Sequence, residues 1–275
     1  MANKSPLINV MERAARKAGR GLLRDFGEVE QLQVSTKGPG DFVSNADHKA
    51  ERVLYEELLR VRPDFGFLME ESGEKPGKDD AYRWIVDPLD GTTNFLHGIP
   101  HFCISIGVEA RSVLGGKLTR EIVAGIVYDP VHDQTYWAEK GAGAFLNDRR
   151  IRVSGRVDLA TSVIASGLPT LERADHDEHI AQTRAMMDKV AGLRRYGAAA
   201  LDLAWVAAGR YDGFWEVALS PWDIAAGIIL VREAGGMITE LDGGTGMMAS
   251  GSVLASNSRM HVQLQDILRK STKNA

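Results

Sequence analysis

The sequence contains a single cysteine, Cys103, among its 275 residues. One cysteine cannot form an intramolecular disulfide, and it cannot supply a thiolate cluster for a metal ion. Cys103 stands in the apolar run F-C-I-S-I-G-V, which is typical of a buried strand. This cysteine usage favours a reducing compartment, so we expect a cytoplasmic protein.

Long apolar runs and a dominant charge are also missing. No stretch approaches the roughly 18 uninterrupted apolar residues of a membrane-spanning helix, and the first ten residues have no apolar core of a signal peptide. The formal net charge is -4 and the pI is about 6.0, which argues against a general nucleic-acid-binding surface. We therefore expect no membrane association and no direct binding of nucleic acid.

The first half of the sequence combines helical patterns with a run of strands. Apolar spacing predicts a helix over residues 6–26 and a second one that begins after the capping residues 44–47 and ends at Arg62. A charged, Gly-rich segment, 73–80, is expected to be a mobile loop. Short apolar segments between turn residues predict strands at 65–69, 84–86, 102–109, 122–128, 134–138, 144–146 and 150–153. We expect helices packed on an antiparallel sheet.

Strands and helices alternate in the second half. Predicted strands at 162–165, 193–196, 213–216, 237–239 and 253–255 are separated by predicted helices at 177–191, 198–208, 222–234 and 260–270. This alternation is typical of an α/β arrangement with a parallel or mixed sheet. The sequence therefore predicts a mixed α/β protein with an N-terminal α+β half, residues 1–155, and a C-terminal α/β half, residues 156–275.

The segment Trp84–Phe95 reads W-I-V-D-P-L-D-G-T-T-N-F and combines a buried strand with polar chemistry. A turn around Pro88 explains one of the two aspartates, Asp87 and Asp90, but not both. The glycine of the following Gly-Thr-Thr turn permits close backbone approach, and amides at a helix start bind phosphate. This segment predicts half of a metal site that faces a phosphate.

Other acidic residues fit the same site. Glu70 and Glu71 follow an apolar strand, where a solvated edge explains one of them. Asp223 lies in the first turn of an apolar helix, where interaction with the helix dipole is the simpler explanation. Oxygen ligands without histidine or cysteine suit Mg²⁺, and clustered carboxylates need cations to offset their repulsion. Paired metal ions activate water for phosphoryl transfer.

The motifs resemble those of the inositol monophosphatase family, the Mg²⁺-dependent, lithium-sensitive phosphatases of inositol and sugar phosphates. They are D-P-L-D-G-T-T-N-F, the upstream G-x-x-x-E-E-S and the downstream W-D-I-A-A-G. The resemblance covers nearly the whole chain. It implies a layered α-β-α-β-α sandwich, a homodimer and two or three Mg²⁺ ions in each active site.

The resemblance also implies roles for individual residues. The implied metal ligands are Glu70, Asp87, the main-chain carbonyl of Leu89, Asp90 and Asp223. The implied catalytic residues are Glu70, Thr92 and Asp90. Phosphate and substrate contacts are implied for Gly91, Thr92, Ala199 and Glu216. A mobile loop and the adjoining helix, linked to the most weakly bound metal ion, are matched by Lys37, Asp41 and Asp47.

The resemblance leaves the substrate open. The leading hypothesis is hydrolysis of myo-inositol 1-phosphate or a similar polyol monophosphate. Fructose-1,6-bisphosphatase, histidinol-phosphate phosphatase and 3'-phosphoadenosine 5'-phosphate phosphatase share the same machinery. Ala198 stands where many relatives carry Ser or Thr, and Asp202 stands where animal relatives carry Asn and bacterial ones often carry Asp; both bear on specificity. A hypothesis of another class is a regulatory binding module associated with the RNA or transcription machinery through protein contacts.

Overall fold

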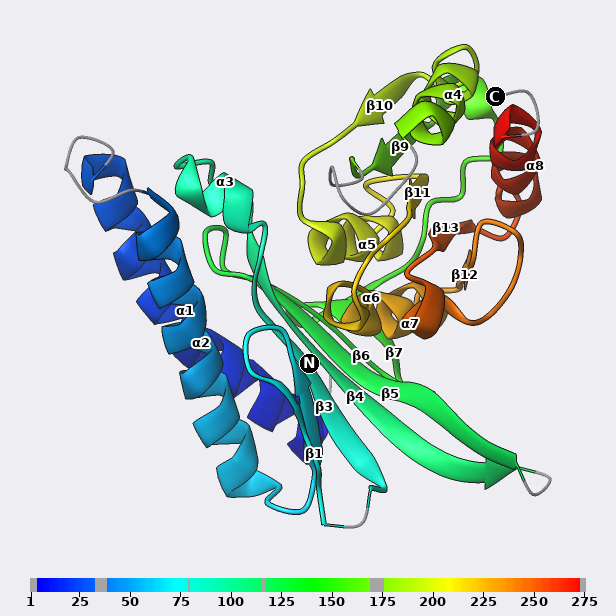
Figure 1. Ribbon diagram of the computed structural model, residues 1–275. Coiled ribbons are helices and arrows are strands. Elements are labelled where there is room, and N and C mark those ends of the chain that lie inside the picture. The colour runs from blue at the N-terminus through cyan, green and yellow to red at the C-terminus, as the bar shows by residue number, and fades with distance from the viewer. Residues whose placement is uncertain (1–3, 33–38, 79, 115–116, 169–175, 273–275) are drawn as a thin grey trace.

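The computed structural model describes residues 4–32, 39–78, 80–114, 117–168 and 176–272. Helices and sheets alternate in five layers, in the order helix, sheet, helix, sheet, helix (Figure 1). This arrangement confirms the predicted mixed α/β fold and its α-β-α-β-α sandwich. The division of the chain near residue 155 stays a prediction.

The first two layers come from the first part of the chain. Helices α1 (Pro6–Leu32) and α2 (Pro39–Val61) cover one face of an eight-stranded sheet (Figure 1). Its strand order is β2-β1-β3-β4-β5-β6-β7-β8, and only the β1–β3 pair is parallel. Its strands are β1 (Gly66–Met69), β2 (Gly73–Lys75), β3 (Tyr82–Asp90), β4 (Cys103–Leu114), β5 (Lys117–Asp129), β6 (Gln134–Glu139), β7 (Gly143–Leu146) and β8 (Arg149–Ile151). The short helix α3 (Thr92–Leu96) joins β3 to β4.

The remaining layers come from the second part of the chain. Helices α5 (Ala199–Ala207) and α6 (Pro221–Glu233) lie between the two sheets, and α4 (His176–Met187) and α8 (His261–Thr272) cover the outer face of the second sheet (Figure 1). This sheet is mixed and has the order β10-β9-β11-β13-β12. Its strands are β9 (Val163–Ser166), β10 (Gly192–Arg194), β11 (Gly213–Glu216), β12 (Gly236–Thr239) and β13 (Val253–Asn257). Two short elements complete the chain, η1 (Leu159–Thr161) and α7 (Met247–Ser250).

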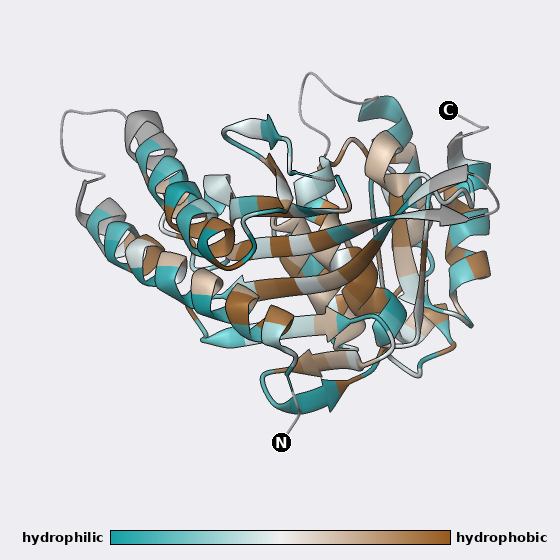
Figure 2. Ribbon diagram, turned by 90° about the horizontal axis from the view of Figure 1, so that it is seen from below, coloured by the Kyte–Doolittle hydropathy of each residue, from teal (hydrophilic) through white to brown (hydrophobic). Residues whose placement is uncertain are grey.

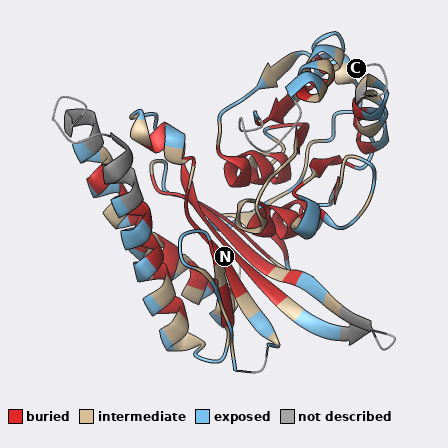
Figure 3. Cartoon of the chain, viewed as in Figure 1, coloured by how far each residue is buried: buried red, intermediate tan, exposed pale blue. Residues whose placement is uncertain are grey.

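Side-chain periodicity explains the layers. The buried residues of α1 recur every three or four positions and form one apolar face: Ile8, Met11, Ala15, Ala18 and Leu22. On β3, Trp84 and Val86 join the core under α1 and α2, whereas Ile85 between them joins the core around α5 and α6. The central strands and α5 and α6 are buried almost throughout (Figure 3), and hydrophobic residues recur along the strands of the first sheet (Figure 2).

Helix α6 lies close to the first sheet because two strands carry glycine beneath it. A Cβ atom on Gly107 would lie 2.8 Å from the Cβ of Ala225, and one on Gly125 would lie 2.8 Å from the Cα of Ala226. Real Cβ atoms do not approach so closely, because interiors are already close-packed. The two glycines therefore set the distance between the sheet and the helix that carries Asp223.

Replacing Gly125 with alanine should lower the free energy of unfolding by about 1–3 kcal/mol, because the added methyl group overpacks the contact with α6. Denaturant unfolding measures this loss. Gly21→Ala is a control of the opposite sign, since nothing lies within 4 Å of a Cβ there and alanine favours a helix by up to about 1 kcal/mol. An unchanged stability of Gly125→Ala would contradict the close approach of α6.

Several boundaries differ from expectation. Helix α1 continues past residue 26 to Leu32, because Glu, Gln and Leu sustain a helix. Helix α2 begins at Pro39, before the expected caps, since proline suits a first helical position. The expected mobile loop contains β2, which folds back on β1 after Gly73 turns the chain at a φ of 72°. Within the described residues, no helix is long and apolar enough to cross a membrane.

Candidate active site

Glu70 and Asp87 meet because β1 and β3 are parallel neighbours: Glu70 directly follows β1, and Asp87 lies near the end of β3. Met69 of β1 is in register with Val86 of β3, and an acidic residue comes next on each strand. The backbone N–H of Glu70 donates to the carbonyl of Val86 at 3.2 Å. A side-chain hydrogen bond also joins Glu70 to Asp87. The parallel pairing therefore brings together two of the predicted metal ligands.

A bulge at the end of β3 orients the next two predicted ligands. The register with β4 shifts between Asp87 and Asp90. Asp87 Oδ1 accepts a hydrogen bond from the backbone N–H of Leu89 at 2.9 Å. The hydroxyl of Thr92 donates to the Leu89 carbonyl at 3.0 Å. These bonds fix the carbonyl of Leu89 between the two aspartates and the threonine.

Gly91 turns the chain from β3 into α3. Its φ is 95°, a left-handed value that glycine adopts without strain. A Cβ atom there would lie 2.9 Å from the carbonyl oxygen of His101. Because α3 begins at Thr92, the amides of its first turn have no partner within the helix. Such backbone N–H groups are suited to phosphate oxygens.

Asp223 reaches the same acids from the third layer. It lies in the first turn of α6, and its Oδ2 accepts a hydrogen bond from the backbone N–H of Ser220 at 2.8 Å. Asp223 therefore does interact with the start of its helix, as the sequence suggested, and it does so as part of a capping box with Ser220. Its charge also raises the pKa of Glu70, Asp87 and Asp90. Asp223 thus caps its helix and lies close to the other acids.

Loss of water and mutual repulsion perturb this group of acids. Burial is the largest cause in each case, followed by the neighbouring carboxylates. The pKa of Glu70 rises to about 7 and that of Asp90 to about 8, while the pKa of Asp87 rises well above its ordinary value. Glu70 is exposed as a whole residue, yet its carboxyl group lies against the others. These raised pKa values disfavour simultaneous charge on Glu70, Asp87 and Asp90, and a bound cation would offset that repulsion.

The chemistry of this donor set fits a hard divalent cation. All the donors are oxygens, as Mg²⁺ prefers. Across the described residues, no group of three His, Cys, Asp or Glu side chains that could hold a metal ion is present. Because carboxylate ligands must be deprotonated, binding a cation at these acids would release protons.

Glu216 and Ala199 lie on the neighbouring elements. Glu216 ends β11 and Ala199 begins α5. Burial raises the pKa of Glu216 well above its ordinary value, and Asp202, Asp223 and Asp90 add to this rise. A Cβ atom on Gly167 would lie 1.8 Å from Glu216 Oε1. The predicted substrate-binding carboxyl group is therefore close to the acids and rests directly on a glycine.

Of the three residues linked to the most weakly bound metal ion, the structure describes the side chain of one, Asp47. Lys37 lies outside the described residues, and so does the side chain of Asp41. Asp47 of α2 is buried, and burial and then Glu71 and Glu70 raise its pKa to about 8. Its Oδ1 has no hydrogen-bond partner among the described residues. Asp47 is therefore close to the predicted site.

Glu51 is an acid of this region that sequence analysis missed. It adds to the raised pKa of Asp47 and Glu70, and its Oε2 accepts a hydrogen bond from the backbone N–H of Glu71 at 2.9 Å. Its position four residues after Asp47, on the same face of a helix, was the available signal.

Asp202 is buried beside this group, and its Oδ1 has no hydrogen-bond partner within the described part of the chain. Burial and then Asp90 raise its pKa well above the ordinary value. A group with a raised folded-state pKa contributes stability that is present below its unfolded pKa, near 4, and is lost as pH rises. Asp202 therefore destabilises the folded state increasingly as the pH rises above about 4.

The free energy of unfolding of Asp202→Asn, relative to that of the wild type, should increase by about 1–2 kcal/mol as the pH rises from 5 to 8. Denaturant unfolding at both pH values in EDTA measures the difference. Asp133→Asn is the control, because a hydrogen bond from Arg16 lowers the pKa of Asp133, so its contribution to stability is complete above pH 5 and the difference between this variant and the wild type should not change from pH 5 to pH 8. A difference for Asp202→Asn that did not change with pH would contradict the assignment.

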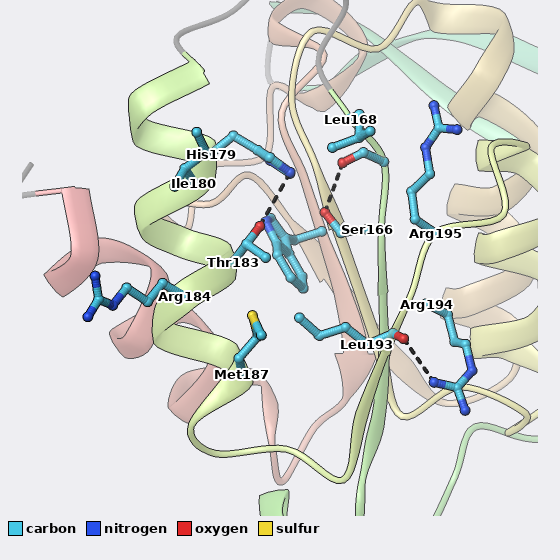
Figure 4. A pocket seen from close by; sticks show the side chains of 12 residues that line it. Ser166, Leu168, His179, Ile180, Thr183, Arg184, Met187, Leu193, Arg194 and Arg195 are labelled. Carbon is cyan, nitrogen blue, oxygen red and sulfur yellow. Dashed lines mark hydrogen bonds between the residues drawn. The ribbon is translucent and has the colours of Figure 1, made fainter.

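A separate cavity of about 360 Å³ lies beside Gly167, between α4 and β10. Figure 4 shows His179 and Thr183 of α4 on one side and Arg194 and Arg195 on the other. Arg194 donates to the carbonyl of Leu193 at 2.8 Å. Arg195 lowers the pKa of Glu216, which places its charge near the predicted substrate-binding end.

The chain is similar to known proteins along nearly its whole length. The model of the inositol monophosphatase family matches residues 3–273. The chain belongs to this family. It is 55% identical to an inositol-1-monophosphatase of Mesorhizobium japonicum, over 97% of each chain. It is 40% identical to Nus factor SuhB of Escherichia coli, over 96% of this chain and 99% of that protein.

A solved structure agrees with the family assignment. The extragenic suppressor protein suhB of Bartonella henselae superposes with a TM-score of 0.87 at 53% identity, covering 97% of this chain and 99% of that one. Membership and the names of these relatives support a phosphatase. The predicted family resemblance is confirmed.

Proposed function

We propose that this member of the inositol monophosphatase family is a Mg²⁺-dependent phosphomonoesterase that hydrolyses myo-inositol 1-phosphate or a similar polyol monophosphate. The observation that supports it best is the parallel pairing of β1 and β3, which sets Glu70 against Asp87. Asp90 and Asp223 lie close to this pair, and the Gly91 turn follows directly. Relatives named inositol-1-monophosphatase favour the same substrate.

The acids and the Leu89 carbonyl would hold Mg²⁺, which when bound lowers the pKa of water and stabilises charge on phosphate oxygens. The backbone N–H groups of Gly91 and Thr92 receive the phosphate. The Thr92 hydroxyl donates its hydrogen bond to the Leu89 carbonyl, so its oxygen is available to accept a hydrogen bond from the attacking water. Glu70 orients the same water and accepts its proton, and attack at phosphorus occurs in line with the departing alkoxide.

Substrate recognition would come from the third and fourth layers. Glu216 accepts hydrogen bonds from ring hydroxyls, and the start of α5 at Ala199 contacts the ring. Asp90 Oδ2 accepts a hydrogen bond from the backbone N–H of Ala200 at 2.7 Å, so the ring-binding helix is tied to the metal-binding strand. A polyol with several hydroxyls suits this arrangement better than a simple alkyl group.

A turnover panel tests the substrate. It uses myo-inositol 1-phosphate, fructose 1,6-bisphosphate, histidinol phosphate and 3'-phosphoadenosine 5'-phosphate, each with Mg²⁺, with EDTA, and with Mg²⁺ plus lithium. We expect inositol 1-phosphate to be fastest, with inhibition by both EDTA and lithium. Hydrolysis of none of the four would refute the proposal, and a faster rival would replace the substrate. Arg194 and Arg195 beside Gly167 make a bisphosphate the strongest rival.

A second role in transcription is a separate candidate, favoured by relatives named Nus factor SuhB. This role would operate through contacts with other proteins. The homodimer and the cytoplasmic location also stay predictions. An Asp87→Asn variant separates the two roles. A cellular phenotype that survives loss of phosphatase activity would establish the second role, and its loss together with turnover would argue against it.

A further inference from the structure

Cys103 does more than fill the core. It is fully buried among the side chains between the first sheet and α5 and α6, as expected of a strand residue in an apolar run. On β4 it is directly opposite Asp90, beyond the bulge of β3. Its Sγ lies 3.6 Å from Asp90 Oδ2, within range of a hydrogen bond from a thiol.

Asp90 Oδ2 therefore has two donors from two different elements. The backbone N–H of Ala200 on α5 donates to it at 2.7 Å, and the thiol approaches from β4. Asp90 Oδ1 accepts no hydrogen bond that the structure places among its described residues, and Asp90 as a whole remains partly exposed. One oxygen is held inward and the other is left for a ligand.

We propose that Cys103 is a positioning residue: its thiol, together with the amide of Ala200, holds Asp90 Oδ2 so that Oδ1 faces the cation. This inference rests on the proposed metal site. Groups that bond to metal ligands orient them and tune their affinity, and losing such a group commonly weakens metal binding tenfold to a hundredfold. A thiol is a weak donor, so a smaller effect is expected here.

The thiol also provides its own signal. The chain has one cysteine, so its S–H stretching band in the infrared belongs to Cys103 alone. Thiols are protonated at neutral pH, and burial keeps this one so. A hydrogen bond to the Asp90 carboxyl group moves the band to lower wavenumber. Metal-free wild-type protein should show this shift relative to the unfolded chain, and Asp90→Ala should reverse it, because the substitution removes the acceptor.

Metal binding supplies the second readout. Mg²⁺ titrated by calorimetry should bind Cys103→Ala about threefold to tenfold more weakly than the wild type. Cys103→Ser retains a donor and should stay within about twofold. Ser162→Ala is the matched control, since Ser162 is also a small buried donor but bonds to the carbonyl of Asp158, in another part of the fold.

Either of two results would overturn the proposal. The first is an S–H band in the folded wild type that matches the band of the unfolded chain or does not move in Asp90→Ala. The second is equal Mg²⁺ affinity in Cys103→Ala and the wild type. The infrared measurement uses metal-free protein and no substrate, so it remains decisive even if the turnover panel fails and the proposed phosphatase activity with it.

Discussion

Replacing Asp87 with asparagine should lower kcat by about a thousandfold or more while the fold is retained. Asparagine keeps an oxygen for the Leu89 amide that now bonds to Asp87, so the bulge survives. The substitution removes a charge from the group that would hold Mg²⁺, and such electrostatic stabilisation is a large part of phosphoryl-transfer catalysis. Steady-state turnover and thermal unfolding with and without Mg²⁺ measure both consequences.

The unfolding experiment gives the expected magnitude. A ligand at 100 times its Kd stabilises the folded state by about 2.7 kcal/mol, so Mg²⁺ should clearly raise the Tm of the wild type and should raise that of Asp87→Asn much less. Asp212→Asn is the matched control, because Asp212 is an equally buried aspartate whose partners are Arg156 and the amide of Val163. It should lose stability yet keep turnover and its response to Mg²⁺. If Asp87→Asn and Asp212→Asn showed the same turnover and the same change of Tm with Mg²⁺, the assignment of Asp87 to the metal site would be contradicted.

Gly167→Ala should lower kcat/KM for inositol 1-phosphate about tenfold to a hundredfold. A Cβ atom there would occupy the position of the Glu216 carboxyl group, 1.8 Å from Oε1, so Glu216 must move away from the ring hydroxyls. A hydrogen bond contributes about 0.5–1.5 kcal/mol, and the loss of about two such bonds to the ring hydroxyls gives the stated range. Glu216→Gln should show the same selective loss.

A simple alkyl phosphate separates recognition from chemistry. It has no ring hydroxyls, so its hydrolysis by Gly167→Ala should stay within about threefold of the wild type. Gly155→Ala is the matched control, since nothing lies within 4 Å of a Cβ at that position. Equal losses on both substrates would show that the substitution damages the metal site and would refute the assigned role of Glu216.

The sequence was most informative where the chemistry is local. The buried strand, the turn around Pro88 and the Gly-Thr-Thr turn of the segment Trp84–Phe95 each depend on a few consecutive residues. They predicted a strand that ends in acids and leads into a helix start, and β3 and α3 have that arrangement. The layered fold was also predictable, but through the family resemblance, because hydropathy patterns alone do not order the layers.

The contacts that couple the layers could not be predicted from the sequence. Met69 meets Val86 only because β1 and β3 are parallel, and the run of predicted strands suggested an antiparallel sheet throughout. The bond from Ala200 to Asp90 and the contact of Gly167 with Glu216 join residues far apart in the chain. Cys103 gave a correct prediction of burial, yet its position opposite Asp90 depends on a bulge that no local pattern reveals.

The most direct test of the central claim is a count of bound divalent ions by Mn²⁺ electron paramagnetic resonance. For the wild type we predict two or three Mn²⁺ per chain, all displaced by Mg²⁺, and fewer in both Glu70→Gln and Asp223→Asn, whose acids come from different layers of the fold. Failure of the wild type to bind Mn²⁺, or an unchanged count in both variants, would contradict a metal site built from these residues.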